Sequence, residues 1–599
     1  MHYITRLQIL VVLLNVILAQ AQMPSSYKIH SHNDYQQKVP FWNAFANGAN
    51  SIEIDVFLVD NELFVAHAED EIQDHLTFKK LYLEPFETAL SLNLDSQQNI
   101  QFLIDIKSDA KTTLAAVVEQ LEQYPSILEN PHVKFVISGN RPAPEDYKKY
   151  PSFIYFDYQS LAPISNEAWE KVALISLPYS DYSVWNGKGR MVSAELNKVE
   201  AVVNKAHNYN KPFRFWGTPD SKSAWKAFYN IGVDFINTDN PYDCERYLSS
   251  IQHRESLTTI FSEVYNPSFV SDEASSKVEN VILLIGDGNG LTQISAAALA
   301  NGGNLTLTKL KNIGLIRTQS ADDFTTDSAA AGTALATGSK TNNRFIGVDS
   351  VGKPLDNITE VLYKHNYKTG VITTDAVTGA TPSAFYAHRA DRDSTAQIAA
   401  DLWKSNLTLF VGGNKNHFNS IIKESPFTVI KDQTKIETSK ADRIGYFIAE
   451  NDVPSILDGR QNDLAELTKQ SLGFLNKDNN PFFLMVEAAK IDSFGHTNNT
   501  GGIITEGIDF DRAITEAIKF ADTHKNTLVI ITADHETSGF GIPQGDIEKH
   551  QIEGDFLTHD HTGVMVPVFA YGPKSEVFSG VYENTEIYTK ILEVLNVKL

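Results

Sequence analysis

The chain has 599 residues, which is more than one hydrophobic core can organise, so several domains are expected. With 42% hydrophobic and 21% charged residues its composition is that of a folded globular protein, which excludes a largely disordered chain. The formal net charge of −23 argues against nucleic acid or an anionic membrane surface as the main partner.

Residues 1–22 have the features of a secretory signal peptide. His2 and Arg6 precede the mostly apolar run from Ile9 to Leu18, and Ala19-Gln20-Ala21 follows as a small-residue cleavage site. The run is too short to cross a membrane, and no later stretch reaches about 18 consecutive apolar residues. The sequence therefore predicts an exported protein, secreted or periplasmic, without a transmembrane segment.

Eight short β-branched and aromatic runs alternate with helical segments in residues 23–251. Eight βα units in such a length predict a (β/α)8 TIM barrel, with an open doubly wound sheet as the alternative. The runs are Tyr27–Ser31, Ser51–Val56, Gln101–Ile106, Lys134–Ser138, Phe153–Phe156, Val172–Ser176, Phe213–Trp216 and Val233–Asn237.

A second α/β pattern occupies residues 279–599. Residues 252–278 lose the strand rhythm, are rich in Ser and Glu, and contain Asn266-Pro267, which predicts a linker. Buried strands then alternate with helices, such as the Ala-rich Ala329–Ala336 and the amphipathic Phe510–Ala521, so we expect a doubly wound α/β sheet. The strand runs are Val281–Ile285, Thr369–Thr373, Phe482–Val486, Thr527–Thr532 and Val566–Ala570.

Acidic side chains follow three of these C-terminal strands. Asp287, Glu487 and Asp534 each follow a strand run within two residues, and His535 is next to Asp534. Because open α/β sheets place their ligand crevice at the carboxyl ends of the strands, we expect these side chains to meet there. Carboxylate oxygens mixed with imidazoles suit zinc and magnesium.

A serine and a spaced pair of ligands complete the pattern. Asp492 and His496 are four residues apart, which places both on one helical face or in one tight loop. Ser328 begins a predicted helix, where free N–H groups and the helix dipole favour an alkoxide or a phosphate. A serine beside metals suggests a covalent phosphoryl intermediate.

Four motifs in this half resemble the alkaline phosphatase family, over residues 281–573. They are specific motifs, and they imply a sheet sandwich of the alkaline phosphatase type. The motifs are Leu284-Ile285-Gly286-Asp287-Gly288, Thr326-Asp327-Ser328-Ala329-Ala330-Ala331-Gly332-Thr333-Ala334, Thr532-Ala533-Asp534-His535-Glu536 and His561-Thr562-Gly563.

The resemblance implies two Zn²⁺ sites and one Mg²⁺ site, with Ser328 as the nucleophile and Arg392 as a bidentate phosphate clamp. His559 competes with His561 as the distal ligand, and the spacing to Thr562-Gly563 favours His561. The implied ligands are Asp492, His496 and His561 for the first zinc, Asp534, His535 and Asp287 for the second, and Asp287, Glu487 and Thr381 for magnesium.

Two positions depart from the family pattern. Gly379 stands where many relatives carry a side chain that supports the third metal, and Ser493 stands where others place a basic or aromatic residue. Side chains at both positions would contact the metal ligands rather than the metal itself and so alter its binding. The identity of the third metal therefore stays open.

The predicted barrel carries its own polar set at the strand ends. Glu53 and Asp55 share one face of the second strand, and Asp105 lies on the third. Three carboxylates suit one Mg²⁺ or Ca²⁺. His32 and His67 follow nearby strands, and histidines suit a general acid and base near neutral pH.

This set resembles the glycerophosphodiesterase and phospholipase-C-like phosphodiesterase superfamily, from about residue 29 to 241. The likeness is carried by Gly48-Ala49-Asn50-Ser51-Ile52-Glu53-Ile54-Asp55-Val56 and Asn237-Thr238-Asp239. It implies that Glu53, Asp55 and Asp105 hold the metal and that His32 and His67 exchange protons with the diester. Lys107 and Trp216 are candidates to line the pocket.

The barrel also departs from its family. His32-Asn33-Asp34 replaces the usual His-Arg-Gly, and Asp105 stands where many relatives have Glu, which suits the sphingomyelinase-D-like branch better. A barrel retained only for binding or packing is the alternative.

Together the two sites predict an exported phosphomonoesterase fused to a phosphodiesterase, releasing phosphate from diesters in two steps. Small phosphate esters and phosphodiesters, lipid-derived ones included, are the expected partners. The main alternative is a single-activity phosphatase whose inactive barrel binds substrate, lipid or a surface, and an inactive scaffold is a weaker one. Headgroup preference stays open, and so does oligomeric state, with a homodimer among the alternatives.

Overall fold

The computed structural model describes residues 27–94, 98–272, 277–460 and 464–598, so the predicted signal peptide at 1–22 lies outside the described residues. The chain divides into two compact units, with the boundary between Ile251 and Gln252. In the described ranges, no helix is both long enough and apolar enough to cross a membrane.

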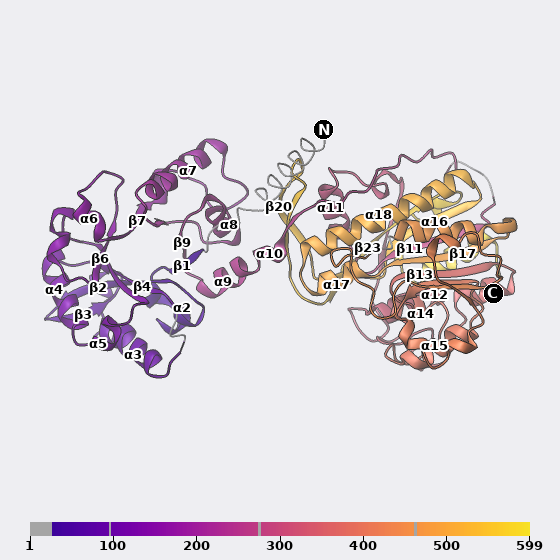
Figure 1. Ribbon diagram of the computed structural model, residues 1–599, viewed down its shortest axis with the longest axis horizontal. Helices are drawn as coiled ribbons and strands as arrows, with labels where there is room; N and C mark the ends of the chain where they lie inside the picture. The colour runs from indigo at the N-terminus through magenta and orange to yellow at the C-terminus, as the bar shows by residue number, and fades with distance from the viewer. Residues whose placement is uncertain (1–26, 95–97, 273–276, 461–463, 599) are drawn as a thin grey trace, which may run out of the picture. The chain divides into compact units, whose positions relative to one another are not determined.

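The described part of the first unit contains a closed barrel of eight parallel strands (Figure 1). The ring closes because β1 pairs with both β2 and β9, as in the register of Ile29 with Ile236. This confirms the predicted TIM barrel and excludes the open sheet. The barrel strands are β1 (Lys28–Ser31), β2 (Ser51–Val59), β4 (Ile100–Ile106), β5 (Val133–Gly139), β6 (Ile154–Tyr158), β7 (Val172–Pro178), β8 (Phe213–Trp216) and β9 (Phe235–Thr238), and β3 (Glu62–Val65) pairs antiparallel with β2.

Alternation along the strands separates the helix-covered outside of the barrel from its inside, which holds an apolar cluster as well as polar groups. Ile52 and Ile54 on β2 are fully buried in the large apolar cluster of this unit, whereas Glu53 and Asp55, which alternate with them, point the other way. Figure 1 shows the helices surrounding the strands. The helices are α2 (Trp42–Ala46), α3 (Glu84–Ser91), α4 (Ala110–Leu121), α5 (Pro125–Leu128), α6 (Asn166–Glu170), α7 (Ser193–Asn208), α8 (Lys222–Ile231) and α9 (Pro241–Ser249).

The second unit is built on a ten-stranded sheet in the order β15-β16-β14-β13-β17-β11-β18-β23-β12-β24. The central strands run parallel, and β23 runs antiparallel to both of its neighbours. The strands are β11 (Asn280–Gly286), β12 (Asn312–Arg317), β13 (Lys368–Ala376), β14 (Leu409–Gly413), β15 (Thr428–Ile430), β16 (Ile444–Phe447), β17 (Phe482–Ala488), β18 (Thr527–Ala533), β23 (Val566–Tyr571) and β24 (Gly580–Glu583).

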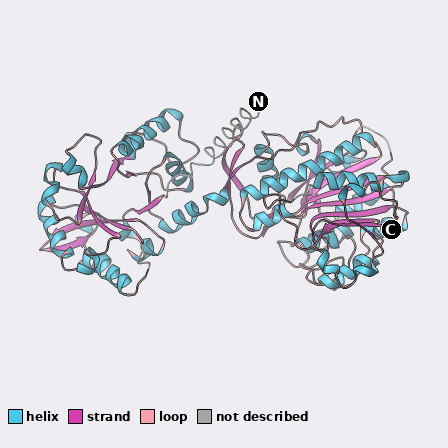
Figure 2. Cartoon of the chain, in the orientation of Figure 1, coloured by secondary structure: helices cyan, strands magenta, loops and turns pink. Residues whose placement is uncertain are grey.

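Helices cover both faces of this sheet, as Figure 2 shows, which confirms the predicted α/β sandwich. Leu283 and Ile285 on β11 belong to one apolar cluster, and Ile282 and Leu284 belong to the cluster on the other face. The helices are α11 (Leu291–Ala300), α12 (Ser328–Thr337), α13 (Ile358–Lys364), α14 (Ala380–Ser383), α15 (Thr395–Lys404), α16 (Leu464–Leu475), α17 (Lys490–His496), α18 (Thr500–Thr523) and α19 (Glu586–Leu595).

Part of the segment predicted as a linker packs into the second unit. β10 (Glu255–Leu257) pairs with β21 (Gln551–Asp555), which in turn pairs with β20 (Gly541–Asp546). Ser262 Oγ then donates to Asp511 at 2.7 Å, and the Tyr265 hydroxyl donates to Asp522 at 2.7 Å. The polar composition of this segment predicted a linker without such contacts. Asp511 and Asp522, its partners, lie some 250 residues further along the chain, so the local sequence does not reveal them.

Candidate active sites

Three neighbouring strands bring the predicted carboxylates of the second unit together. β11 lies between β17 and β18 in the sheet. Asp287 directly follows β11, Asp534 directly follows β18, and Glu487 lies near the end of β17, opposite Ile285. Because the strands are parallel, all three side chains reach the same edge of the sheet, where they are buried.

Asp287, Asp534 and His535 form a compact set of candidate metal ligands. One ligand atom from each lies within 4.8 Å of the others. Nε2 of His535 is 3.5 Å from Asp287 Oδ1 and 3.4 Å from Asp534 Oδ2. Both carboxylate oxygens are buried and accept no hydrogen bond. A bound cation would satisfy these oxygens, so the residues present fit a metal.

Asp492, His496 and His561 form a second set beside the first. Helix α17 places Asp492 and His496 on one face, with His496 Nε2 3.3 Å from Asp492 Oδ2. Strand β22 (His561–Thr562) pairs with β19 (Glu536–Thr537) and brings His561 Nε2 to 3.5 Å from Asp492 Oδ1. The competing His559 turns away, since its Nδ1 contacts the backbone oxygen of His496 at 3.0 Å.

Glu487 and Thr381 lie at a third position. Thr373 donates a hydrogen bond to Glu487, and the buried hydroxyl of Thr381 lies close enough to this carboxylate to oppose the rise in its pKa that burial causes. Sequence reasoning missed Asp375, whose charge helps raise the pKa of Glu487, after the larger effect of burial. Asp375 Oδ1 is 3.7 Å from Lys490 Nζ, so this carboxylate has a cationic partner.

Ser328 and Arg392 line the mouth of this site. Ser328 is the first residue of α12, and Asp327 caps that helix by accepting a hydrogen bond from the backbone N–H of Ala330 at 2.9 Å. Arg392 Nη1 donates to the other Asp327 oxygen at 3.0 Å. The Asp327 contribution was missed, although it precedes Ser328 in the motif. The cavity holds about 310 Å³ and is lined by Asp323, Thr325, Thr326, Asp327, Ser328, Asn343, Arg392, Asp492, His496, Asp560 and His561.

Without bound cations, the negative charges of the buried carboxylates in this site repel one another. Burial, together with the charge of Asp534, raises the pKa of Asp287 well above its usual range, and burial raises the pKa of Asp534 to about 7. Burial also lowers the pKa of His535 to about 3, and its hydrogen bond to Asp492 raises the pKa of His496 to about 9. Asp560 joins His496 and His561 in a further group of potential ligands that the sequence did not indicate.

The barrel brings its three predicted carboxylates together at the strand ends. Ligand atoms of Glu53, Asp55 and Asp105 lie within 4.8 Å of one another, and Asp55 Oδ1 is buried without a hydrogen-bond partner. A cation would satisfy this oxygen as well. Lys107 Nζ already lies 3.0 Å from Asp55 Oδ2 and 3.0 Å from Asp105 Oδ1.

The two predicted barrel histidines differ in their surroundings. His67 Nδ1 is 3.2 Å from Asp55 Oδ2 and 3.2 Å from the Tyr35 hydroxyl, so His67 borders the carboxylate cluster. His32 Nδ1 contacts Asp239 at 2.7 Å. Burial opposes protonation of His32, but this contact and the charge of Glu53 raise its pKa above the usual value.

Sequence reasoning missed the buried partners of Glu53. His30 Nε2 lies 2.8 Å and Arg214 Nη1 lies 3.0 Å from the same oxygen of Glu53. The strand period could have indicated Arg214, because it alternates with the apolar Phe213 and Phe215 on β8. Trp216, named as a candidate lining residue, ends β8 and is partly exposed.

Comparisons with known proteins match both units. The sequence model of the alkaline phosphatase family matches residues 278–430, 412–549 and 545–597. An AIM6-like phosphodiesterase domain matches residues 21–94, and the glycerophosphoryl diester phosphodiesterase family matches residues 212–242.

The similar proteins cover the second unit. Alkaline phosphatase 4 of Bacillus subtilis is 31% identical over 411 residues, covering 53% of this chain and 89% of that protein. Streptomycin-6-phosphate phosphatase of Streptomyces griseus is 29% identical over 408 residues, covering 53% of this chain and 91% of that protein. The structure of alkaline phosphatase from the Antarctic bacterium TAB5 is 40% identical, covers 54% of this chain and 99% of that one, and has a TM-score of 0.51.

Proposed function

The chain belongs to the alkaline phosphatase family, and we propose that it is an exported, metal-dependent phosphomonoesterase whose barrel first hydrolyses phosphodiesters. Small phosphate esters would be substrates of the second unit, and phosphodiesters, including lipid-derived ones, would be substrates of the barrel. The observation that carries the phosphatase assignment is the position of Ser328 Oγ, 3.3 Å from Nε2 of His535. A nucleophile beside a ligand cluster is what phosphoryl transfer through a phosphoserine requires.

Each side chain of the phosphatase site has a role in this proposal. Ser328 attacks the phosphorus of the monoester, and the leaving alcohol departs on the opposite side. Arg392, held by Asp327, offers two parallel N–H donors to the non-bridging oxygens of the phosphate. Two Zn²⁺ would lower the pKa of the nucleophile and stabilise the leaving oxygen. One would be held by Asp287, Asp534 and His535, and the other by Asp492, His496 and His561. Mg²⁺ would be held at Glu487 and Thr381.

In the barrel, Glu53, Asp55 and Asp105 would hold one Mg²⁺ or Ca²⁺ against the diester. His67 lies beside Asp55 of the cluster, whereas His32 contacts Asp239, which is outside the cluster. This separation suits one histidine as the base and the other as the acid that protonates the leaving alcohol. Linking both steps in one chain would raise the local concentration of the monoester without requiring a channel.

Lys107 supports an alternative for the barrel. Its ammonium group lies 3.0 Å from both Asp55 and Asp105, so a permanent side-chain charge can balance these carboxylates without a metal. In that case the barrel would bind substrate, lipid or a surface, and the second unit would be the only catalyst. The two functions differ in whether any diester is cleaved.

The full-length Ser328→Ala variant tests the proposal. Incubated with glycerophosphodiesters and Mg²⁺ or Ca²⁺, it should accumulate a phosphomonoester, which phosphorus NMR detects, whereas the parent protein should release inorganic phosphate. A cyclic phosphate product would mean attack by a hydroxyl of the substrate itself, and would contradict delivery to the second unit. Absence of cleavage of every diester would favour the binding alternative.

A further inference from the structure

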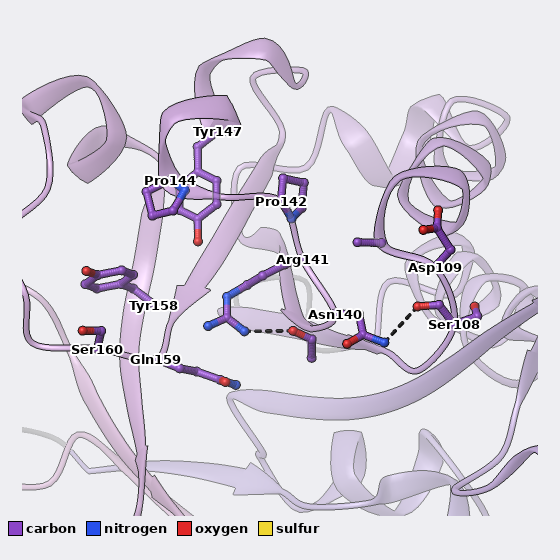
Figure 3. A pocket seen from close by; sticks show the side chains of 12 residues that line it. Ser108, Asp109, Asn140, Arg141, Pro142, Pro144, Tyr147, Tyr158, Gln159 and Ser160 are labelled. Atoms are coloured by element: carbon purple, nitrogen blue, oxygen red, sulfur yellow. Dashed lines mark hydrogen bonds between the residues drawn. The ribbon is translucent and has the colours of Figure 1, made fainter.

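A polar pocket opens beside the carboxylate cluster of the barrel, at the ends of β4, β5 and β6. It holds about 520 Å³, and Figure 3 shows its lining side chains. The lining residues are Ser108, Asp109, Ala110, Gly139, Asn140, Arg141, Pro142, Pro144, Tyr147, Tyr158, Gln159 and Ser160. Of the residues assigned above to barrel chemistry, none belongs to this lining, so the pocket adjoins the cluster without being part of it.

Gly139 joins the pocket to the candidate metal site. A Cβ atom on Gly139 would lie 2.2 Å from Asp105 Oδ1, so the chain passes directly against that carboxylate. Gly139 has φ +64°, a left-handed conformation that ends β5 and turns the following residues toward the pocket. Asn140 Nδ2 then donates to the backbone oxygens of Lys107 and Ser108, at 3.1 and 2.9 Å, which ties this turn to the end of β4.

The turn places Arg141 in the pocket. Figure 3 shows its guanidinium between Tyr147 and Gln159. Nη1 donates to the backbone oxygen of Gly139 at 2.9 Å, which orients the group. Within the described ranges Arg141 forms no ion pair, although the whole chain has a net charge of −23. A half-buried cation with unused donors in a concave site is suited to an anion.

Among the residues that the structure describes, the neighbouring carboxylates form no ion pair with Arg141. Asp109 caps helix α4, accepting from the N–H groups of Lys111 and Thr112. Asp157 Oδ2 accepts from Ser138 at 2.9 Å and from Gln159 at 3.4 Å, whereas its buried Oδ1 has no hydrogen-bond partner. Among the lining residues, the guanidinium of Arg141 is the one cationic group.

The walls of the pocket are rigid and offer a further donor. The ring of Tyr147 stacks on Phe156, with centroids 3.8 Å apart and planes 4° from parallel. Ser160 Oγ accepts from the backbone N–H of Ala162 at 3.1 Å, so its own hydroxyl hydrogen can be directed to a ligand. A positioned guanidinium and a hydroxyl on fixed walls form a preorganised anion site.

We propose that the Arg141 pocket binds a second negatively charged group of the diester, a carboxylate or a phosphate on its alcohol, and so selects anionic headgroups. This inference rests on the proposed phosphodiesterase function, because it places the scissile phosphate at the carboxylate cluster and the headgroup in the pocket. The pocket begins at Gly139, next to Asp105, so a headgroup can extend from one site into the other.

Binding is the deciding measurement, because it does not need turnover. The full-length His32→Asn, Ser328→Ala variant should leave diesters intact, which phosphorus NMR of the recovered ligand checks. Calorimetry then compares glycerophosphoserine with glycerophosphoethanolamine, which differ by one carboxylate, and glycerophosphoglycerol phosphate with glycerophosphoglycerol, which differ by one phosphate. We expect the member that carries the additional carboxylate or phosphate to bind about tenfold more tightly in at least one pair, and the pair that responds identifies the anion.

Adding Arg141→Gln should abolish that preference while leaving the affinity for the member without the additional anionic group unchanged, and Arg141→Lys should restore part of it. Circular dichroism melting checks that the variants fold. Equal binding of both members in both pairs overturns the inference, and so does a preference that survives Arg141→Gln, or no binding at all. Hydrolysis by the Ser328→Ala protein, measured separately, decides the phosphodiesterase function, so the two failures are distinguishable.

Discussion

The hydroxyl oxygen of Ser328 lies 3.3 Å from Nε2 of His535, although 207 residues separate them in the chain. Replacement of Ser328 by Ala should therefore lower the hydrolysis of p-nitrophenyl phosphate by at least about 10³-fold, since no other hydroxyl takes its place as nucleophile. Metal content, measured by atomic emission, should not change. Thr337→Ala, at the other end of α12, is the matched control and should keep full activity. Retained turnover in Ser328→Ala would contradict the phosphoserine route.

Arg392 should contribute to phosphate binding through the parallel N–H donors of its guanidinium group. Arg392→Ala should raise KM for monoesters by about tenfold or more, and Arg392→Lys should not restore it, because an ammonium cannot bind two phosphate oxygens in parallel. Arg389 in the same loop pairs with Asp401 at 2.5 Å and offers the control. Arg389→Lys should leave KM unchanged, and an equal effect of both substitutions would mean that the loop, rather than the fork, is responsible.

Metal removal should make stability depend on pH. Burial raises the pKa of Glu487 from 4.5 to about 8 and that of Asp534 from 3.8 to about 7 in the metal-free site. A carboxyl with a raised folded-state pKa binds more protons when folded, so stability falls as pH rises between the ordinary and the raised values. The Tm of chelated protein should therefore decrease from about pH 5 to about pH 8.

Adding Zn²⁺ and Mg²⁺ should raise Tm, and the gain should be larger at the higher pH, because the ligands bind metal in their ionised form. Differential scanning fluorimetry at both pH values measures this gain. A gain that does not grow with pH would show that these carboxylates are not the ligands.

A buried charge network should stabilise the second unit. Arg460 Nη2 lies 2.9 Å from Glu506 Oε2 and 2.6 Å from Asp509 Oδ2, and all three side chains are almost fully buried. Arg460→Ala removes the guanidinium that contacts Glu506 and Asp509 and should cost about 3–5 kcal/mol in the unfolding of this unit. The exposed pair of Arg317 with Glu583 is the comparison, and Arg317→Ala should cost under about 1 kcal/mol. Similar costs in urea denaturation would contradict this prediction.

Gly→Ala substitutions at two positions of the barrel distinguish the effect of backbone strain from that of steric crowding. Gly139 and Gly189 have φ of +64° and +62°, but a Cβ at Gly139 would lie 2.2 Å from Asp105 Oδ1, whereas Gly189 has no neighbour within 4 Å. Gly189→Ala should cost about 1 kcal/mol of stability. Gly139→Ala should cost more, because its Cβ would also lie 2.6 Å from the backbone oxygen of Ile106. Only Gly139→Ala should displace Asp105 and weaken Mg²⁺ or Ca²⁺ binding, measured by calorimetry. Equal metal affinity in the two variants would exclude Asp105 as a ligand.

The fold could be predicted because its signal is periodic and local. The β-branched runs match barrel strands such as β4 and β7 to within two residues, since alternating or continuous burial constrains the residue types of each strand. The linker prediction was wrong for residues 255–257, which form β10, because the pairing partner of that strand, β21, lies far away in sequence. Residue composition does not report such a distant partner.

By itself the sequence indicated the candidate site residues, because Asp287, Ser328, Asp534 and their neighbours stand in specific motifs or shortly after strands. Only the tertiary structure decided which of them meet and what surrounds them. Asp327 orients Arg392, Asp375 lies near Glu487, and Arg141 enters a pocket beside Asp105. These relationships depend on contacts between separate strands and loops, which local periodicity does not encode.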